Sequence, residues 1–128
     1  GGDRDSKKRP IMGEISGRLA DFTVLTSDQV RTEDPRKILA DIEVGLKKSG
    51  GDYIVILNRT EAIRCAIHMM NKDDILVIPG LGNDLYIDYM GVKYPYNERT
   101  IIAEIIDEML DPNTTNKTSN DLINKFPF

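Results

Sequence analysis

The alternation of apolar, β-branched runs with stretches of helical periodicity most constrains how these 128 residues can fold. Apolar runs that read as strands occupy residues 22–26, 53–57 and 75–78, and helical spacing of apolar residues covers residues 10–19, 35–46 and 62–70. Strands that are nearly continuous apolar runs and alternate with helices are typical of a parallel sheet covered on both faces. We therefore predict parallel strands joined by right-handed helical crossovers.

The pattern changes after the third predicted strand. Residues 85–96 contain two alternating stretches around Gly91, which predicts an antiparallel hairpin. Residues 101–110 are strongly amphipathic and predict a closing helix that starts near Asn97 or Glu98. The predicted fold class is α/β and Rossmann-like, with a mostly parallel sheet, helices on both faces and an antiparallel hairpin near the C-terminal end.

Composition bounds the domain organisation and the partners. Residues 1–110 are expected to form one domain, and residues 111–128 a polar, mobile tail rich in Asn, Thr and Ser. A net charge of -4 argues against nucleic acid or an anionic membrane as the main partner. No apolar run approaches the ~18 residues of a membrane span, and no signal-peptide-like leader opens the chain. The single cysteine, Cys65, excludes a disulfide framework, so we expect a cytoplasmic protein.

Segments that follow strands are the first place to look for a site, because ligands of open α/β sheets bind beyond the carboxyl ends of the strands. The candidate segments are residues 1–9, if a strand precedes them, and residues 27–31, 58–59 and 80–84. They are predicted to meet at one edge and to bring together the cations Arg4, Arg9, Arg31 and Arg59 and the anions Asp3, Asp28 and Asp84. Arginine's planar fork suits carboxylate or phosphate, so anionic groups are the expected ligands.

Each candidate also has a purely structural interpretation. Arg59 follows a helix cap and could be a surface residue, Asp28 could cap a loop, and Gly80 and Gly82 could serve a turn. The lone His68 lies within a predicted helix between core positions. The sequence shows no metal-ligand cluster, Walker A pattern, Cys-x-x-Cys or nucleophile elbow. We therefore assign no catalytic residue and no metal site to this chain, and any catalysis must be shared.

Motifs in a fixed order carry a family resemblance. They are Gly2-Asp3-Arg4-Asp5 with Lys8-Arg9-Pro10 and Met12-Gly13, then Leu19-Ala20-Asp21, Thr26-Ser27-Asp28, Glu33-Asp34-Pro35, Asp41-Ile42 with Gly45, and Arg59 with Glu61-Ala62-Ile63. This series, over residues 1–110, resembles the C-terminal domain of the Mur ligases, in particular the MurE class, the UDP-N-acetylmuramoyl-tripeptide synthetases. The first block is similar to the GDRD…KRPxMG block of that family.

The resemblance implies an ATP-dependent ligase of peptidoglycan synthesis. Such enzymes phosphorylate a carboxylate of a UDP-N-acetylmuramoyl peptide, and the amine of an amino acid then attacks the acyl phosphate. ATP and Mg²⁺ are held mainly by a central domain of the same protein, while the C-terminal domain closes over the site and binds the incoming amino acid. The family's domain also carries a helix and a strand before the Gly-Gly loop, so Gly1 is expected to follow a strand.

The resemblance also implies roles for individual residues. Arg4 matches an arginine that contacts the carboxylate of the incoming amino acid. Arg31 matches the arginine of a DNPR motif, which recognises the distal group of the same amino acid. Gly80 and Asp84 match the ends of a GKGHE motif that holds the far end of diaminopimelate. The substrate-binding set is expected to be Arg4, Asp28, Gln29, Arg31, Gly80, Asn83 and Asp84, with Asp3, Arg9 and Arg59 near nucleotide or phosphate.

Two departures from the family pattern bear on specificity. Gln29-Val30 stands in place of Asn-Pro, and Leu81, Asn83 and Asp84 in place of Lys, His and Glu. The second change removes two possible cations from the expected pocket wall and shortens a carboxylate by about one methylene, which favours a substrate of different size or charge from diaminopimelate. A catalytically inactive binding or regulatory module of the same family is the alternative, and an unrelated nucleotide-binding α/β domain is a third hypothesis.

Overall fold

The computed structural model describes residues 1–111 and 113, so most of the expected tail, residues 112 and 114–128, lies outside the described residues. No helix in this described part is long and apolar enough to cross a membrane. The elements in chain order are α1 (Lys8–Leu19), β1 (Thr23–Leu25), α2 (Pro35–Ser49), β2 (Tyr53–Val55), α3 (Arg59–Met69), β3 (Tyr86–Tyr89), β4 (Val92–Pro95) and α4 (Glu98–Leu110).

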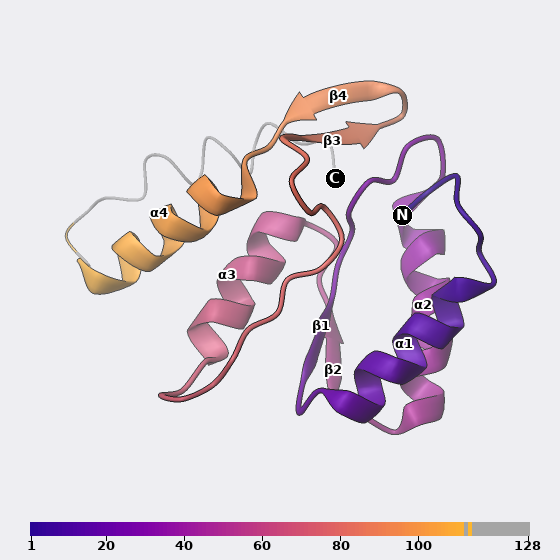
Figure 1. Ribbon diagram of the computed structural model, residues 1–128, viewed down its shortest axis with the longest axis horizontal. Coiled ribbons are helices and arrows are strands. Elements are labelled where there is room, and N and C mark those ends of the chain that lie inside the picture. The colour runs from indigo at the N-terminus through magenta and orange to yellow at the C-terminus, as the bar shows by residue number, and fades with distance from the viewer. Residues whose placement is uncertain (112, 114–128) are drawn as a thin grey trace.

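The parallel pair β1–β2 lies between two groups of helices. Thr23 pairs with Tyr53 and Leu25 with Val55. Helices α1 and α2 lie on one side of these strands and α3 on the other (Figure 1). The predicted α/β class, with parallel strands and helices on both faces, is therefore confirmed.

Local capping chemistry sets the starts of three helices. The side chain of Asp34 accepts the amide two residues on at 2.9 Å, with Pro35 as the first residue of α2. Asn58 and Asn97 each accept the amide three residues on, at 3.0 and 3.2 Å, at the starts of α3 and α4. Gly50 adopts φ +72° after α2, a left-handed conformation that glycine tolerates best. The predicted start of the closing helix near Asn97 or Glu98 and the predicted cap before Arg59 are confirmed.

Helices α1 and α2 pack backbone to backbone through glycines. A Cβ on Gly45 would lie 1.8 Å from the carbonyl oxygen of Pro10, and one on Gly13 would lie 2.0 Å from that of Ile42. Because the buried residues of α1 are Arg9 and Gly13, its apolar side chains face outward: Ile11, Met12, Ile15 and Leu19 are exposed. The predicted helix is present, but its apolar residues do not form the buried face.

The third predicted strand, residues 75–78, is wrong as a strand. The segment is extended but carries no strand assignment, and among the described residues no backbone hydrogen bond joins it to a neighbour. Its side chains still alternate: Leu76 and Ile78 pack against a hydrophobic cluster, while Ile75 and Val77 are 89% and 75% exposed. A strand needs a pairing partner as well as an apolar pattern, and the described chain supplies none here.

The hairpin predicted around Gly91 is confirmed as β3 and β4. Tyr86 pairs with Pro95 and Tyr89 with Val92, and the two turn residues Met90 and Gly91 have φ of +51° and +78°. Positive φ at both turn positions matches the right-handed twist of the strands.

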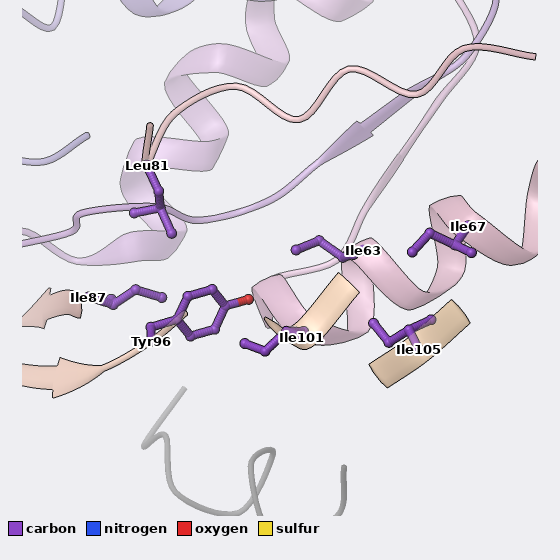
Figure 2. Close-up of a cluster of buried hydrophobic side chains, with 7 residues drawn as sticks. All are labelled: Ile63, Ile67, Leu81, Ile87, Tyr96, Ile101 and Ile105. Carbon is purple, nitrogen blue, oxygen red and sulfur yellow. The ribbon is translucent and has the colours of Figure 1, made fainter. Parts of the chain in front are cut away.

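Two hydrophobic clusters support these elements. The larger one joins α3, α4, the hairpin and the 79–84 loop, and Figure 2 shows its members: Ile63, Ile67, Leu81, Ile87, Tyr96, Ile101 and Ile105. Burial raises the pKa of the Tyr96 phenol, whose oxygen lies 3.2 Å from the hydroxyl of Thr60. The smaller cluster lies between β1 and α2 and contains Leu25, Leu39 and Leu46. The smaller cluster thus packs β1 against α2, and the larger one joins α3 and α4 to the hairpin and to the 79–84 loop.

Candidate functional site

The four segments predicted to meet do so in the structure, and direct hydrogen bonds join them. The amide of Gly2 donates to the carbonyl of Gln29 at 2.7 Å, and the side chain of Gln29 donates to the Asp84 carboxylate at 3.1 Å. Arg59 donates to the carbonyl of Ser27 at 3.1 Å. We call this group the loop cluster; it consists of residues 1–5, 27–33, 58–59 and 79–84.

Close backbone approach fixes the N-terminal segment of the loop cluster. A Cβ on Gly2 would lie 1.8 Å from the carbonyl oxygen of Val30, so only glycine fits there. Arg31 Nη1 donates to the Gly2 carbonyl at 2.6 Å. Asp3, at φ +52°, accepts from the hydroxyl of Thr32 at 2.7 Å and from its amide at 3.2 Å. The carboxylate of Asp3 therefore holds two segments of the cluster together.

Arg9 lies inside the domain with its guanidinium engaged. Its Nη1 donates to Asp41 at 2.9 Å, and its Nη2 donates to Glu33 at 2.8 Å and to the carbonyl of Gly1 at 3.1 Å. The Arg9 side chain is 3% exposed, and its buried Nε has no hydrogen-bond partner among the described residues. Arg9, expected near nucleotide or phosphate, is thus placed as a buried anchor between α1, α2 and the N-terminal segment.

The charges around Arg9 shift one another's titration. The pKa of the Glu33 carboxyl lies below its ordinary value, chiefly because Arg9 donates to it, with the Asp3 amide as a second donor at 2.6 Å. The pKa of Arg9 is raised above its already high value, chiefly through Glu33. Both shifts favour the charged pair.

Arg31 is held by its backbone as well as its side chain. It adopts φ +53°, its amide donates to the carbonyl of Asp88 at 2.9 Å, and its carbonyl accepts from Met90 at 2.6 Å. A parallel bridge pairs it with Tyr89. A non-glycine residue in this left-handed region carries strain, which fits a position that the surrounding structure fixes.

Both ends of the Gln29 amide are used within the domain. Its Nε2 donates to Asp84 and to the carbonyl of Tyr86, at 3.1 and 2.9 Å, and its Oε1 accepts from the amide of Asp88 at 2.6 Å. The residue is 5% exposed. Gln29 therefore orients Asp84 and β3, and its contact with a substrate stays a prediction.

The 79–84 loop divides into an inward and an outward side. Gly80 adopts φ +121°, and a Cβ built on it would lie 3.1 Å from Oδ2 of Asp28. Leu81 is 3% exposed and belongs to the larger hydrophobic cluster (Figure 2), while Asn83 and Asp84 are exposed. Leu81 itself lies in the core, and the loss of two cations from the pocket wall stays a prediction.

Arg59 is 3% exposed and binds three separate parts of the chain. Its Nη1 donates to the carbonyl of Ser27 at 3.1 Å, and its Nη2 donates to that of Pro79 at 3.1 Å. Its Nε and Nη2 also donate to the Glu98 carboxylate, at 2.5 and 3.2 Å. The surface interpretation of Arg59 is therefore wrong.

The charged groups left at the exposed side of the loop cluster differ from these anchors. Arg4 is exposed, and no hydrogen bond or ion pair engages it within residues 1–111 and 113. Asp28 Oδ1 lies 3.2 Å from the backbone nitrogen of Gly1, and its side chain is 24% exposed. With Arg31 and Asp84 these residues offer two cations and two anions, an arrangement that suits a ligand carrying both carboxylate and ammonium groups. The described residues contain no group of three or more His, Cys, Asp or Glu placed to hold a metal ion.

Two site residues were missed by sequence reasoning alone. Glu98 is the carboxylate that neutralises Arg59, and Glu33 joins Arg9 to the N-terminal segment. A buried arginine requires an anion nearby. A single sequence does not show which acidic residue supplies that anion. Glu98, for example, lies 39 positions from Arg59 in the chain.

Comparisons with known proteins agree on one family. The family described as "Mur ligase, glutamate ligase domain" matches residues 1–82. UDP-N-acetylmuramoyl-L-alanyl-D-glutamate--2,6-diaminopimelate ligase of Caldanaerobacter subterraneus subsp. tengcongensis is 47% identical over 108 residues, which cover 84% of this chain and 22% of that protein. The ligase of the same name from Alkaliphilus metalliredigens is 56% identical over 84 residues, 66% of this chain and 17% of its own length.

A solved structure gives the same picture. A structure titled as a UDP-N-acetylmuramoyl-L-alanyl-D-glutamate--2,6-diaminopimelate ligase superimposes with a TM-score of 0.80 at 37% identity, over 86% of this chain and 23% of that one. This chain thus spans about a fifth of the length of the curated relatives it matches.

Proposed function

Since this chain belongs to the Mur ligase family and carries its glutamate ligase domain, we propose that it is the amino-acid-binding C-terminal domain of an ATP-dependent ligase. The complete protein would join an amino acid to a UDP-N-acetylmuramoyl peptide in peptidoglycan synthesis. The step forms an amide when the amine of the amino acid attacks an acyl phosphate of the peptide and displaces phosphate.

The observation that carries this proposal is the convergence of the loop cluster. Hydrogen bonds between Gly2 and Gln29, and between Gln29 and Asp84, bring three separate segments to one side of the domain. There Arg4 and Arg31 supply cations for carboxylates, and Asp28 and Asp84 supply anions for ammonium groups. An amino acid whose side chain carries further charged groups matches these two cations and two anions.

The names of the curated relatives give 2,6-diaminopimelate as the amino acid that they ligate. We propose that the complete form of this protein also adds 2,6-diaminopimelate. This amino acid has two carboxylate and two ammonium groups, in keeping with the charges of the loop cluster. Leu81 is buried, so of the three differences from the family motif only Asn83 and Asp84 lie on the exposed side of the loop. Asp84, although shorter than glutamate, is oriented by Gln29.

ATP and Mg²⁺ are proposed to bind outside this domain. Arg9 and Arg59, the two arginines expected near phosphate, are buried and engaged by carboxylates. The described residues therefore do not fit a phosphate or metal site of their own. On the family resemblance, a central domain of the same protein would supply both, and the complete enzyme would work in the cytoplasm without nucleic acid or membrane partners.

For the domain boundaries, we propose that a strand preceding Gly1 lies between β1 and residues 75–78. The extended segment with exposed Ile75 and Val77 would then gain its missing partner. Together with residues 1–110 it would complete the parallel sheet. Hydrogen exchange in a longer chain tests this: the amides of residues 75–78 should become protected, and unchanged exchange would count against the extra strand.

The catalytically inactive binding module remains the competing function, favoured by the engagement of Gln29 within the domain. ADP release by the complete protein separates the two. With ATP, Mg²⁺ and a UDP-N-acetylmuramoyl dipeptide, release should depend on 2,6-diaminopimelate and be weaker with lysine or glutamate. Absence of release with every amino acid would refute the ligase and support the binding module.

A further inference from the structure

We propose that Arg59 is a positioning residue that sets the spacing between the two loops that bind the incoming amino acid. Its guanidinium donates to the carbonyl of Ser27 on one loop and to that of Pro79 on the other, both at 3.1 Å. One rigid group thus fixes two segments that are 52 positions apart in the chain. This inference rests on the proposed function, because it assumes that these loops bind the amino acid.

The chemistry of the contact requires arginine. Four of the five N–H donors of Arg59 are used, two of them on the Glu98 carboxylate at 2.5 and 3.2 Å. The planar fork places donors in different directions at fixed angles, which a lysine ammonium on a flexible stem cannot do. Lysine would keep the charge next to Glu98 but could not span both carbonyls.

The position of Arg59 connects it directly to the exposed charges of the loop cluster. A Cβ built on Gly80 would lie 3.7 Å from Arg59 Nη1 and 3.1 Å from Oδ2 of Asp28. The Arg59 guanidinium and the Asp28 carboxylate therefore both lie close to Gly80. A change in the length or direction of the Arg59 side chain would move Asp28 and Gly80 relative to each other without removing either.

The same two helices provide a matched control. Arg64 of α3 donates to Glu108 of α4 at 2.5 Å, so it joins α3 to α4 just as Arg59 joins α3 to Glu98 at the start of α4. No hydrogen bond of Arg64 to a carbonyl of the loop cluster is present among the described residues. Replacing Arg64 removes a helix-to-helix ion pair and leaves the two loops in place.

Steady-state kinetics of the complete protein test the proposal. In Arg59→Lys we expect KM for the amino acid to rise about tenfold, the effect of losing roughly 1.4 kcal/mol of binding, while KM for ATP stays unchanged. Arg64→Met should leave both constants unchanged. Equal rises for amino acid and ATP in Arg59→Lys, or the same amino acid effect in Arg64→Met, would overturn the positioning role.

Amide hydrogen exchange provides a second readout that does not require activity. In Arg59→Lys the amides of residues 27–31 and 79–84 should exchange faster together, whereas α1 and α2 should not change; Arg64→Met should leave both loops protected. Unchanged loop exchange in Arg59→Lys would refute the anchoring of the loops. If the unmodified protein releases no ADP with any amino acid, the proposed function fails, and the exchange data still decide the role of Arg59.

Discussion

Replacing Gly45 by alanine tests the backbone contact between α1 and α2, because two physical effects predict opposite signs. In a helix interior, alanine is more favourable than glycine by about 0.5–1 kcal/mol. In this structure, however, the added Cβ would lie 1.8 Å from the carbonyl oxygen of Pro10 and 2.6 Å from the amide nitrogen of Glu14. Both atoms belong to the main chain of α1 and cannot rotate away.

The size of the penalty follows from that geometry. To restore even a 3.0 Å contact, the two helices must separate by at least 1.2 Å at this point. A radial gap of about 0.5–1 Å already costs packed atoms a quarter to a half of their dispersion attraction, and overpacking costs about 1–3 kcal/mol. Subtracting the propensity gain, we expect Gly45→Ala to lower the free energy of unfolding by about 1 kcal/mol.

Urea denaturation of the chain, followed by circular dichroism, measures this difference. Gly17→Ala is the comparison: its added Cβ would lie 1.9 Å from Oγ and 2.8 Å from Cβ of Ser49, which are side-chain rather than main-chain atoms. We expect Gly17→Ala to be less destabilising than Gly45→Ala, because the hydroxyl can move at the loss of its hydrogen bond to the carbonyl of Leu46. If Gly45→Ala is as stable as the unmodified chain, or more stable, helix propensity dominates and the proposed backbone contact between the helices is refuted.

Three further predictions concern the site, the acid range and the core. Arg31→Ala in the complete protein should raise KM for the amino acid far more than KM for ATP; equal changes would count against its proposed contact with the substrate. Because the pKa of Glu33 is lowered by Arg9, the stabilisation it provides is present above the ordinary glutamate pKa and is lost as pH falls through the lower, folded-state value. Glu33→Gln should thus lower the urea midpoint at pH 7 but have little effect well below pH 4, and a difference that persists in acid would contradict the coupling. Ile105→Ala, at a position 1% exposed between α3 and α4, should cost about 2–5 kcal/mol in urea denaturation; a loss below about 1 kcal/mol would show that the larger cluster repacks.

Features set by neighbouring residues could be predicted from the sequence. The caps at Asp34, Asn58 and Asn97 depend on a side chain and an amide two or three positions apart, and the turn at Gly91 depends on two adjacent residues. The parallel pairing of β1 with β2 follows from the alternation of strands and helices. The meeting of the four loops then follows from the topology, because parallel strands end at the same edge.

Features set by distant residues could not be predicted in this way. Residues 75–78 have the composition of a strand, but a strand also needs a partner whose position the pattern does not contain. The ion pairs of Arg9 with Glu33 and of Arg59 with Glu98 could not be predicted either, because they form only when the tertiary fold brings the partners together. The sequence therefore predicted which segments meet, but not which arginines are buried as anchors and which remain available to a ligand.

The unpaired segment at residues 75–78 affects how the chain behaves when it is studied alone. Its backbone groups have no partner strand among the described residues, and Ile75 and Val77 add exposed apolar side chains. Such an edge is a template for intermolecular β-pairing, which leads to aggregation as protein concentration rises. Low solubility of the isolated chain would consequently reflect this open edge, and a charged substitution such as Val77→Lys would be the first change to make before crystallisation or NMR.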